Sequence, residues 1–303
     1  MVLETVIEQI ISLVIIALIG FYGGKKKIID EKVSNGLTRI LLEISVPLLI
    51  VSSFNFKFTP DIATNIKKAF IYSLIIFIMT PILVKPLLLR VDRNKKNILQ
   101  FSMVFSNCGF MGFPLALCVF GAEGVVYASI FNIFFNLFIW TYGVMLFSDV
   151  TSFKELKNVI KNPGIISAVI GLIIMVFSIN IHPVLLNTMK MVGGLTTPVS
   201  MLIIGSLLSR TNFRAYMKDI TIYYGLAIKL LLIPVVIFLI ASLFNERSIV
   251  IKTLILMQAM PVAAMASMFA ENFNRDREYS AVIVSLSTIV CVATIPLIIK
   301  LCF

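Results

Sequence analysis

The segment S-N-C-G-F-M-G-F-P at residues 106–114 combines a ligand-binding group with residues that weaken a helix. The amide of Asn107 can both donate and accept hydrogen bonds. Gly109 and Gly112 lower helix stability, and Pro114 lacks a backbone donor and clashes with the carbonyl four residues before it. We therefore expect a broken helix whose free N–H groups, together with the amide, can bind an anion.

A second segment, Q-A-M-P-V-A-A, repeats these components in Gln258 and Pro261. A half-helix that begins near Pro114 or Pro261 would carry a partial positive charge of roughly half a unit at its N-terminus. Two such ends that meet from opposite sides can bind an anion without a formal cation. The alternative is a pair of ordinary proline kinks, with the glycines serving close helix packing.

Further polar groups lie within apolar segments. Lys229 could be the countercharge of a carboxylate substrate or a cation that changes its charge, or it could extend to the membrane surface or pair with Glu43. Asn132 and Asn136 share one helix face, where they could bind a ligand or join neighbouring helices. Ser52 is a further candidate hydroxyl for the site.

The elements that must position these residues are membrane-spanning helices. The chain of 303 residues is 59% hydrophobic and 14% charged, with a mean hydropathy of +1.02. Soluble domains contain about 25% charged residues, and one bilayer span needs roughly 20 apolar residues. We expect an all-α integral membrane protein with ten spans, at about 5–23, 37–56, 68–89, 98–120, 124–147, 163–180, 185–208, 220–243, 249–271 and 280–301.

The net charge of +11 is carried by cations that flank the apolar segments. This pattern is typical of loops that face anionic lipid, so the lipid bilayer is an expected partner and nucleic acid is not. Alternate loops are richer in Lys and Arg, and their side should be cytoplasmic. Both termini are then expected outside the cytoplasm.

The two halves of the chain are similar to each other. A shift of 151 residues places Asn107 on Gln258, and it places Pro47 on Pro198. Two units of five spans have opposite orientations, so we expect inverted repeats, a common plan in secondary transporters. The division is a first repeat at 1–148, a cytoplasmic linker at 149–162 and a second repeat at 163–303.

Metal and enzyme chemistry are not expected. His182 is the sole histidine, and the four cysteines lack ligand spacing. No span contains the paired aspartates that would hold magnesium. We expect packing roles for the cysteines in general, although Cys108 lies inside the motif and joins the candidate binding residues. The sequence predicts no cofactor.

The motif S-N-C-G-F-M-G-F-P, followed by F-G-A-E-G at 120–124 and K-L-L-L-I-P at 229–234, resembles the auxin efflux carrier family. The resemblance covers the whole chain. It implies a fold like that of the bile-acid/sodium symporters, in which the fourth and ninth helices are broken and cross. It also implies one group of helices built from spans 1, 2, 6 and 7 and a moving group built from the rest. The family's crossover positions correspond to Asn107, Gly109, Gly112, Pro114 and Pro261.

Members of this family carry small organic anions such as auxin, malate or malonate. The expected function is therefore alternating-access transport of such an anion across the plasma membrane, and related carriers are commonly homodimers. The alternative is a sodium- or proton-coupled carrier of another solute class on the same fold. Acidic residues, which such carriers place near the crossover, are absent from 107–114 and 258–262.

Overall fold

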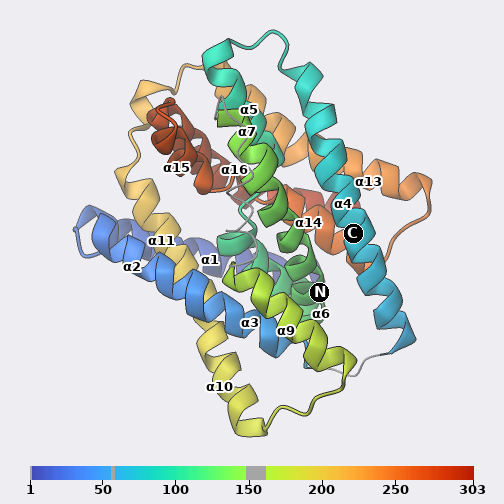
Figure 1. Ribbon diagram of the computed structural model, residues 1–303. Coiled ribbons are helices and arrows are strands. Elements are labelled where there is room, and N and C mark those ends of the chain that lie inside the picture. Colours follow the sequence, from blue (N-terminus) through green and yellow to red (C-terminus); the bar gives the residue numbers. More distant parts are fainter. Residues whose placement is uncertain (1, 56–58, 148–161) are drawn as a thin grey trace. The chain divides into compact units, whose positions relative to one another are not determined.

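The computed structural model describes residues 2–55, 59–147 and 162–303. This part of the chain is helical, apart from connections and one isolated β-bridge (Figure 1). Nearly all of the linker expected at 149–162 lies outside the described residues. The α-helices are α1 (Val2–Lys25), α2 (Glu31–Ile40), α3 (Val46–Ser53), α4 (Pro60–Leu87), α5 (Arg93–Val104), α6 (Phe113–Phe138), α7 (Val144–Phe147), α9 (Pro163–Val176), α10 (Pro183–Gly194), α11 (Thr196–Arg210), α12 (Ile220–Ala227), α13 (Ile233–Leu243), α14 (Ile249–Ala259), α15 (Met265–Asn272) and α16 (Arg277–Cys302).

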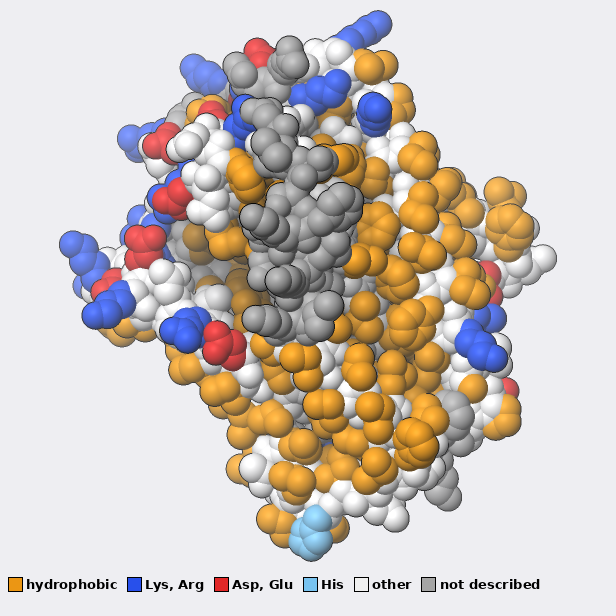
Figure 2. Space-filling view, in the orientation of Figure 1, with side chains coloured by type: hydrophobic (Ala, Val, Ile, Leu, Met, Phe, Trp, Pro, Cys, Tyr) orange, Lys and Arg blue, Asp and Glu red, His pale blue; other side chains and the backbone are white. Residues whose placement is uncertain are grey.

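Six helical segments among the described residues are long and apolar enough to cross a membrane. On the face shown in Figure 2, hydrophobic side chains form broad areas, and Lys and Arg side chains lie mainly toward the edges of the view. Three shorter apolar helices lie at Ile10–Lys25, Pro163–Val176 and Ile249–Ala259. The six long segments are Glu31–Ser53, Pro60–Leu87, Cys108–Phe147, Pro183–Arg210, Ile220–Leu243 and Arg277–Cys302.

The described residues form two compact units that each combine segments from both halves of the sequence. Unit 1 takes its residues from Met1–Ile71, Gly109–Ile133 and Ile160–Arg210. Unit 2 takes its residues from Tyr72–Cys108, Phe134–Val159 and Thr211–Phe303. The spans expected at 5–23, 37–56, 163–180 and 185–208 thus all fall in unit 1.

Within unit 1, small residues let α1 and α11 approach each other closely. A Cβ atom at Gly20 would lie 2.4 Å from the carbonyl oxygen of Leu202. A Cβ atom at Gly205 would lie 1.9 Å from the carbonyl oxygen of Ala17. Lipid chains are as apolar as leucine, so helices in a membrane associate through such tight packing more than through the hydrophobic effect.

The helix α6 contains a sharp turn at Gly121. The residue has φ 66° and ψ −156°, while the residues on either side are helical. Only glycine adopts such a backbone conformation readily, because it has no Cβ atom. This turn separates the segments expected as the fourth and fifth spans.

Three π-helical turns precede prolines in the same way. The turns at Leu41–Ser45, Cys108–Gly112 and Ile228–Leu232 each end two residues before a proline, at positions 47, 114 and 234. After the first and third turns, the residue before the proline donates its N–H to the carbonyl five residues back. The wider turn lets the helix pass a residue that has no donor. Lys229 lies inside the third turn.

The helices α5 and α12 both lead toward the site described below. Their N-terminal ends are joined to each other in unit 2. Asp219 accepts a hydrogen bond from the backbone N–H of Thr221 at the start of α12 and forms an ion pair with Lys95 on α5. Burial acts to raise the pKa of Asp219, but the hydrogen bonds from Lys95 and Thr221 outweigh it and hold this pKa below its ordinary value. The ion pair therefore links the two helices at one end.

Replacement of Gly205 by alanine should lower the stability of unit 1 by about 1–3 kcal/mol, because α1 and α11 must separate to admit the methyl group. The matched control is Gly36→Ala in α2, where no atom lies within 4 Å of the added Cβ atom. This control should be neutral or slightly stabilising, since alanine favours helix over glycine. Thermal unfolding of the two purified variants measures the difference, and equal midpoints would contradict the tight packing.

Candidate functional site

Two helices of unit 2 are interrupted by extended backbone. After α5 ends at Val104, the chain is not helical until the π-helical turn that begins at Cys108. After α14 ends at Ala259, the chain is extended at Met260, with φ −60° and ψ 153°, and the next helix begins at Met265. Both interruptions occur in apolar surroundings, where unpaired backbone groups are costly.

The two extended segments pair with each other as a short antiparallel bridge between Ser106 and Val262. The N–H of Asn107 donates to the carbonyl oxygen of Pro261 at 2.7 Å. The N–H of Ala263 donates to the carbonyl oxygen of Phe105 at 3.0 Å. Each break thus supplies hydrogen-bond partners for the other.

Ser106 connects this bridge to Lys229. The ammonium of Lys229 donates to Oγ of Ser106 at 2.5 Å. The hydroxyl of Ser106 in turn faces two acceptors on Gln258, the backbone oxygen at 3.1 Å and Oε1 at 3.4 Å. A single residue of the first break therefore contacts both the cation and the second broken helix.

Gln258 and Ser287 complete the connections around the bridge. Nε2 of Gln258 donates to the carbonyl oxygen of Val104 at 3.2 Å, at the end of α5. The N–H of Val262 donates to Oγ of Ser287 on α16 at 3.0 Å, and this hydroxyl donates to the carbonyl of Val284. These bonds hold the extended segments in one position.

Lys229 is fully buried, with a relative exposure of 0%. The interpretation that it extends to the membrane surface is therefore wrong. Within the described parts of the chain, no carboxylate forms an ion pair with it. Glu43, the partner considered from the sequence, pairs with Arg39 on an exposed surface. A buried cation whose partner is an uncharged hydroxyl has no neutralising negative charge beside it, and an anion could supply one.

The position of the first break differs from the prediction. The sequence predicted a half-helix that starts near Pro114, but helical structure resumes at Cys108. Gly109 and Gly112 lie in the π-helical turn, and Pro114 follows as the second residue of α6. The break falls earlier because the backbone groups of Phe105 and Asn107 bond to the other segment, while the wide turn accommodates the proline.

The remaining candidates are buried in the helices. Asn107 and Asn136, both in unit 2, are each 6% exposed. In unit 1, Nδ2 of Asn132 would lie 3.2 Å from a Cβ atom at Gly164, which places this side chain against α9. Oγ of Ser52 donates to the carbonyl of Leu49 in its own helix.

No group of three or more His, Cys, Asp or Glu side chains that could hold a metal ion occurs among the residues described. Cys108 is buried, and the reduced cysteines at 118, 291 and 302 are buried or half-buried. The polar groups at the bridge are amides, hydroxyls and one ammonium, which bind ligands by hydrogen bonds and charge.

A family model described as membrane transport protein matches residues 5–158 and 149–299, which is nearly the whole chain. The chain belongs to this family, the auxin efflux carriers. As a membrane transport protein it is a multi-pass membrane protein, in agreement with the apolar helices, and the family is one of membrane transporters.

Two relatives resemble this membrane transport protein over nearly their full lengths. An uncharacterized transporter of Methanocaldococcus jannaschii is 21% identical over 294 residues, 93% of this chain and 94% of the relative. An uncharacterized transporter of Methanothermobacter thermautotrophicus is 23% identical over 299 residues, 96% of each chain. Both names agree with the family.

The sequence did not single out Ser106 and Ser287 of this transport protein, although both hold the bridge in place. Serine is common in membrane helices, so its type alone carries little signal. Two features could have indicated them. Ser106 begins the motif, and Ser287 corresponds to Asn136 at the shift of 151 residues.

Replacement of Ser106 by alanine should destabilise the transport protein by about 1–3 kcal/mol, because Nζ of Lys229 loses its acceptor in a buried place. The matched control is Ser102→Ala, since that hydroxyl bonds only to the carbonyl of Ile98 in its own helix. Thermal unfolding in detergent compares the two variants.

The double variant Ser106→Ala with Lys229→Met separates the charge from the loss of the hydroxyl. It should regain most of the stability that Ser106→Ala loses, because no buried cation is left without its acceptor. Equal unfolding midpoints for Ser106→Ala and Ser102→Ala would contradict the role of Ser106.

Proposed function

We propose that this membrane transport protein is a secondary carrier of small organic anions, and that the bridge between the two broken helices is its binding site. One observation carries the proposal. Lys229 is fully buried, donates to Ser106 at the bridge, and has no carboxylate partner among the described residues. A carboxylate substrate would provide the missing negative charge.

The energetics of a buried cation favour this assignment. A lysine inside a membrane segment costs about 2.5–3.5 kcal/mol on insertion scales, and such residues usually face a cavity or a partner. A stabilising role alone would be better served by an apolar residue of similar size. A cation that is buried at this free-energy cost is most useful at a site where an anionic substrate binds and is released.

The groups around Lys229 suit a carboxylate. Asn107 and Gln258 carry amides that can donate hydrogen bonds, and both belong to the paired segments. Cys108 and Asn136 of the same unit, with Pro261, are proposed further contacts. Gly109, Gly112 and Pro114 of the motif, with Asn132 and Ser52 as further candidates, stay predictions of substrate-binding residues from the sequence.

The substrate class that we propose is that of monocarboxylates and dicarboxylates such as malate, malonate or auxin-like acids. The motif at 106–114 and the absence of acidic residues from the two breaks support an anion over a cation. A carrier that bound sodium or a proton as its main ligand would be expected to place carboxylates there. Coupling to such an ion stays an alternative, for which a sodium or pH gradient is the test.

The architecture that we propose is a ten-helix inverted repeat, with residues 1–148 and 163–303 as the two halves and alternating access as the mechanism. The pairing of breaks that lie at matching positions in the two halves supports this plan. So does the presence of four expected spans, the first, second, sixth and seventh, in unit 1. We further propose the plasma membrane as the location, with both termini outside the cytoplasm and a homodimer as the assembly.

Uptake of radiolabelled malate and malonate into proteoliposomes tests the proposal, with and without unlabelled dicarboxylate trapped inside. The native protein should show uptake that the trapped anion stimulates. Lys229→Met should lower uptake about 100-fold or more, because the substrate loses its buried countercharge. The matched control is Lys190→Met, which removes a charge from an exposed lysine of α10 and should leave uptake unchanged.

Asn107→Ala should abolish uptake while the protein stays folded, since the backbone bonds of residue 107 do not need its side chain. Asn187→Ala, at an exposed position of α10, is its control. Normal uptake by folded Asn107→Ala and Lys229→Met variants would remove both residues from the site. Absence of malate and malonate uptake by the native protein would exclude these two substrates.

A further inference from the structure

The hydrogen-bond partner of Lys229 allows this lysine two charge states. Within the part of the chain that the structure describes, Nζ of Lys229 bonds to the hydroxyl of Ser106 alone, at 2.5 Å. An ammonium offers only donors, whereas a neutral amine also has a lone pair that accepts a hydrogen bond. A hydroxyl donates and accepts, so Ser106 can bond to either form. A carboxylate partner would instead favour the charged form.

The hydrogen of the Ser106 hydroxyl can turn without any change in the backbone. It faces the backbone oxygen of Gln258 at 3.1 Å and Oε1 of the same residue at 3.4 Å. When Nζ of Lys229 carries a lone pair, the same hydrogen can turn to it. The paired segments at Ser106 and Val262 can therefore keep their geometry whether the lysine is charged or neutral.

The helices around Lys229 bring no negative charge to it. The helices α5, α12, α13, α14 and α16 pack against its π-helical turn. Among the described residues, the thiol of Cys108 is the one titratable group near enough to interact electrostatically with Lys229. The helix α13 contains no titratable side chain. On the other four helices, Lys95 binds Asp219, Tyr224 binds the carbonyl of Leu87, Lys252 binds the carbonyl of Phe303, and Cys291 binds the carbonyl of Thr288.

The charge state of Lys229 should therefore depend on the substrate. A buried ammonium with no anion beside it has lost its hydration and has gained no countercharge. A neutral amine avoids most of this cost, because burial of an uncharged polar group is far less unfavourable than burial of a charge. A bound carboxylate reverses the balance, since an opposite charge nearby favours the ammonium.

We propose that Lys229 takes up one proton with each substrate anion and releases it when the anion leaves, which makes this transporter a proton–anion symporter. The inference rests on the proposed function, because the anion must bind beside Lys229. It adds the identity of the coupling ion and the side chain that carries it.

In one transport cycle, the proton moves between water and Nζ of Lys229. On the side where the substrate enters, the amine takes a proton from water, and the resulting ammonium pairs with the substrate carboxylate. On the opposite side the substrate leaves as a carboxylate, the ammonium returns its proton to water, and the hydroxyl of Ser106 bonds to the lone pair. One proton crosses with each anion, so a monocarboxylate crosses without net charge.

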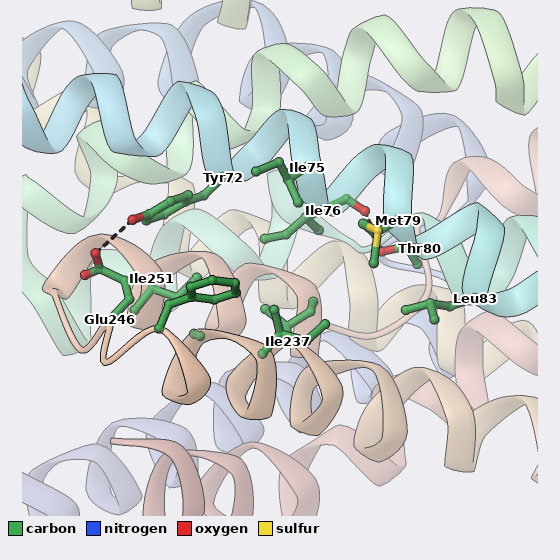
Figure 3. A pocket seen from close by; sticks show the side chains of 12 residues that line it. Tyr72, Ile75, Ile76, Met79, Thr80, Leu83, Ile237, Glu246 and Ile251 are labelled. Carbon is green, nitrogen blue, oxygen red and sulfur yellow. Dashed lines mark hydrogen bonds between the residues drawn. The ribbon is translucent and has the colours of Figure 1, made fainter.

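A second group of unit 2 that could carry a proton is the carboxylate of Glu246. It lies at one end of an apolar groove between α4 and α13, where it accepts from the hydroxyl of Tyr72 at 2.8 Å (Figure 3). Glu246 precedes the start of α14, whereas Gln258 of the bridge lies near the end of that helix. The two candidate proton carriers are therefore separate, and a test can distinguish them.

Proteoliposomes that contain the full-length protein and a trapped pH-sensitive dye test the coupling, with malonate as the probe. Addition of malonate outside should acidify the lumen. With the membrane potential held at zero by valinomycin and equal potassium, a gradient of one pH unit, acid outside, should raise malonate accumulation about tenfold for one proton per anion. Vesicles with Lys229→Met measure the proton that undissociated malonic acid carries through lipid by itself.

Lys229→Arg separates binding of the anion from movement of the proton. A guanidinium provides a countercharge but does not lose its proton in proteins. This variant should still exchange labelled for unlabelled malonate, while the acidification of the lumen should fall about tenfold or more. The matched control is Glu246→Gln, which should keep both activities within about twofold of the native values.

The possible outcomes distinguish this inference from the proposed function. Malonate uptake by the native protein without acidification, and without a response to the pH gradient, would overturn the coupling and leave an anion carrier. Acidification that Lys229→Arg keeps and Glu246→Gln loses would assign the proton to the groove and overturn the role of Lys229. Absence of both uptake and exchange by the native protein would count against the proposed function itself. The measurements on the native protein need no variant, so they decide the question even if Lys229→Arg does not fold.

Discussion

Every backbone N–H and C=O group that leaves a helix inside a membrane must find another partner, and this requirement governs the centre of unit 2. The segments around Ser106 and Val262 are both extended, and each would be unstable alone. Together they satisfy one another through the bonds from Asn107 to Pro261 and from Ala263 to Phe105. The two breaks are thus a single structural feature, and neither half of the chain can form it by itself.

The polar side chains around the paired segments are also hydrogen-bonded to partners inside the protein. Ser106 accepts from Lys229 and donates to Gln258, whose amide in turn bonds to the end of α5. A fully buried network of this kind is rigid when all its members are bonded and costly when one is lost. Such a network suits a binding site, because it holds a cation and the amide of Gln258 near paired backbone without relying on water.

The helices of the two units are held together by different kinds of packing. In unit 1, Gly20 and Gly205 allow the backbones of α1 and α11 to touch, which is packing of the kind that fixes helices firmly in lipid. In unit 2, the aromatic rings of Phe101, Phe105 and Phe269 pack against one another. The proposed anion site lies in this second unit.

The sequence by itself determined the class of the protein and the apolar segments that form its helices, and it predicted the interruptions that the structure shows near Asn107 and Pro261. These depend on local composition, since apolar runs form membrane helices and a proline removes a donor wherever it stands. Only the tertiary structure decided that the first break lies before Cys108 rather than at Pro114, that Ser106 joins the two halves, and that Lys229 is buried instead of reaching the surface. The physical reason is the same in each case. The partners of backbone groups that leave a helix, and of a buried lysine, come from segments more than 100 residues away along the chain. The bonds of Ser106 with Lys229 and with Gln258, for example, join residues 123 and 152 positions apart.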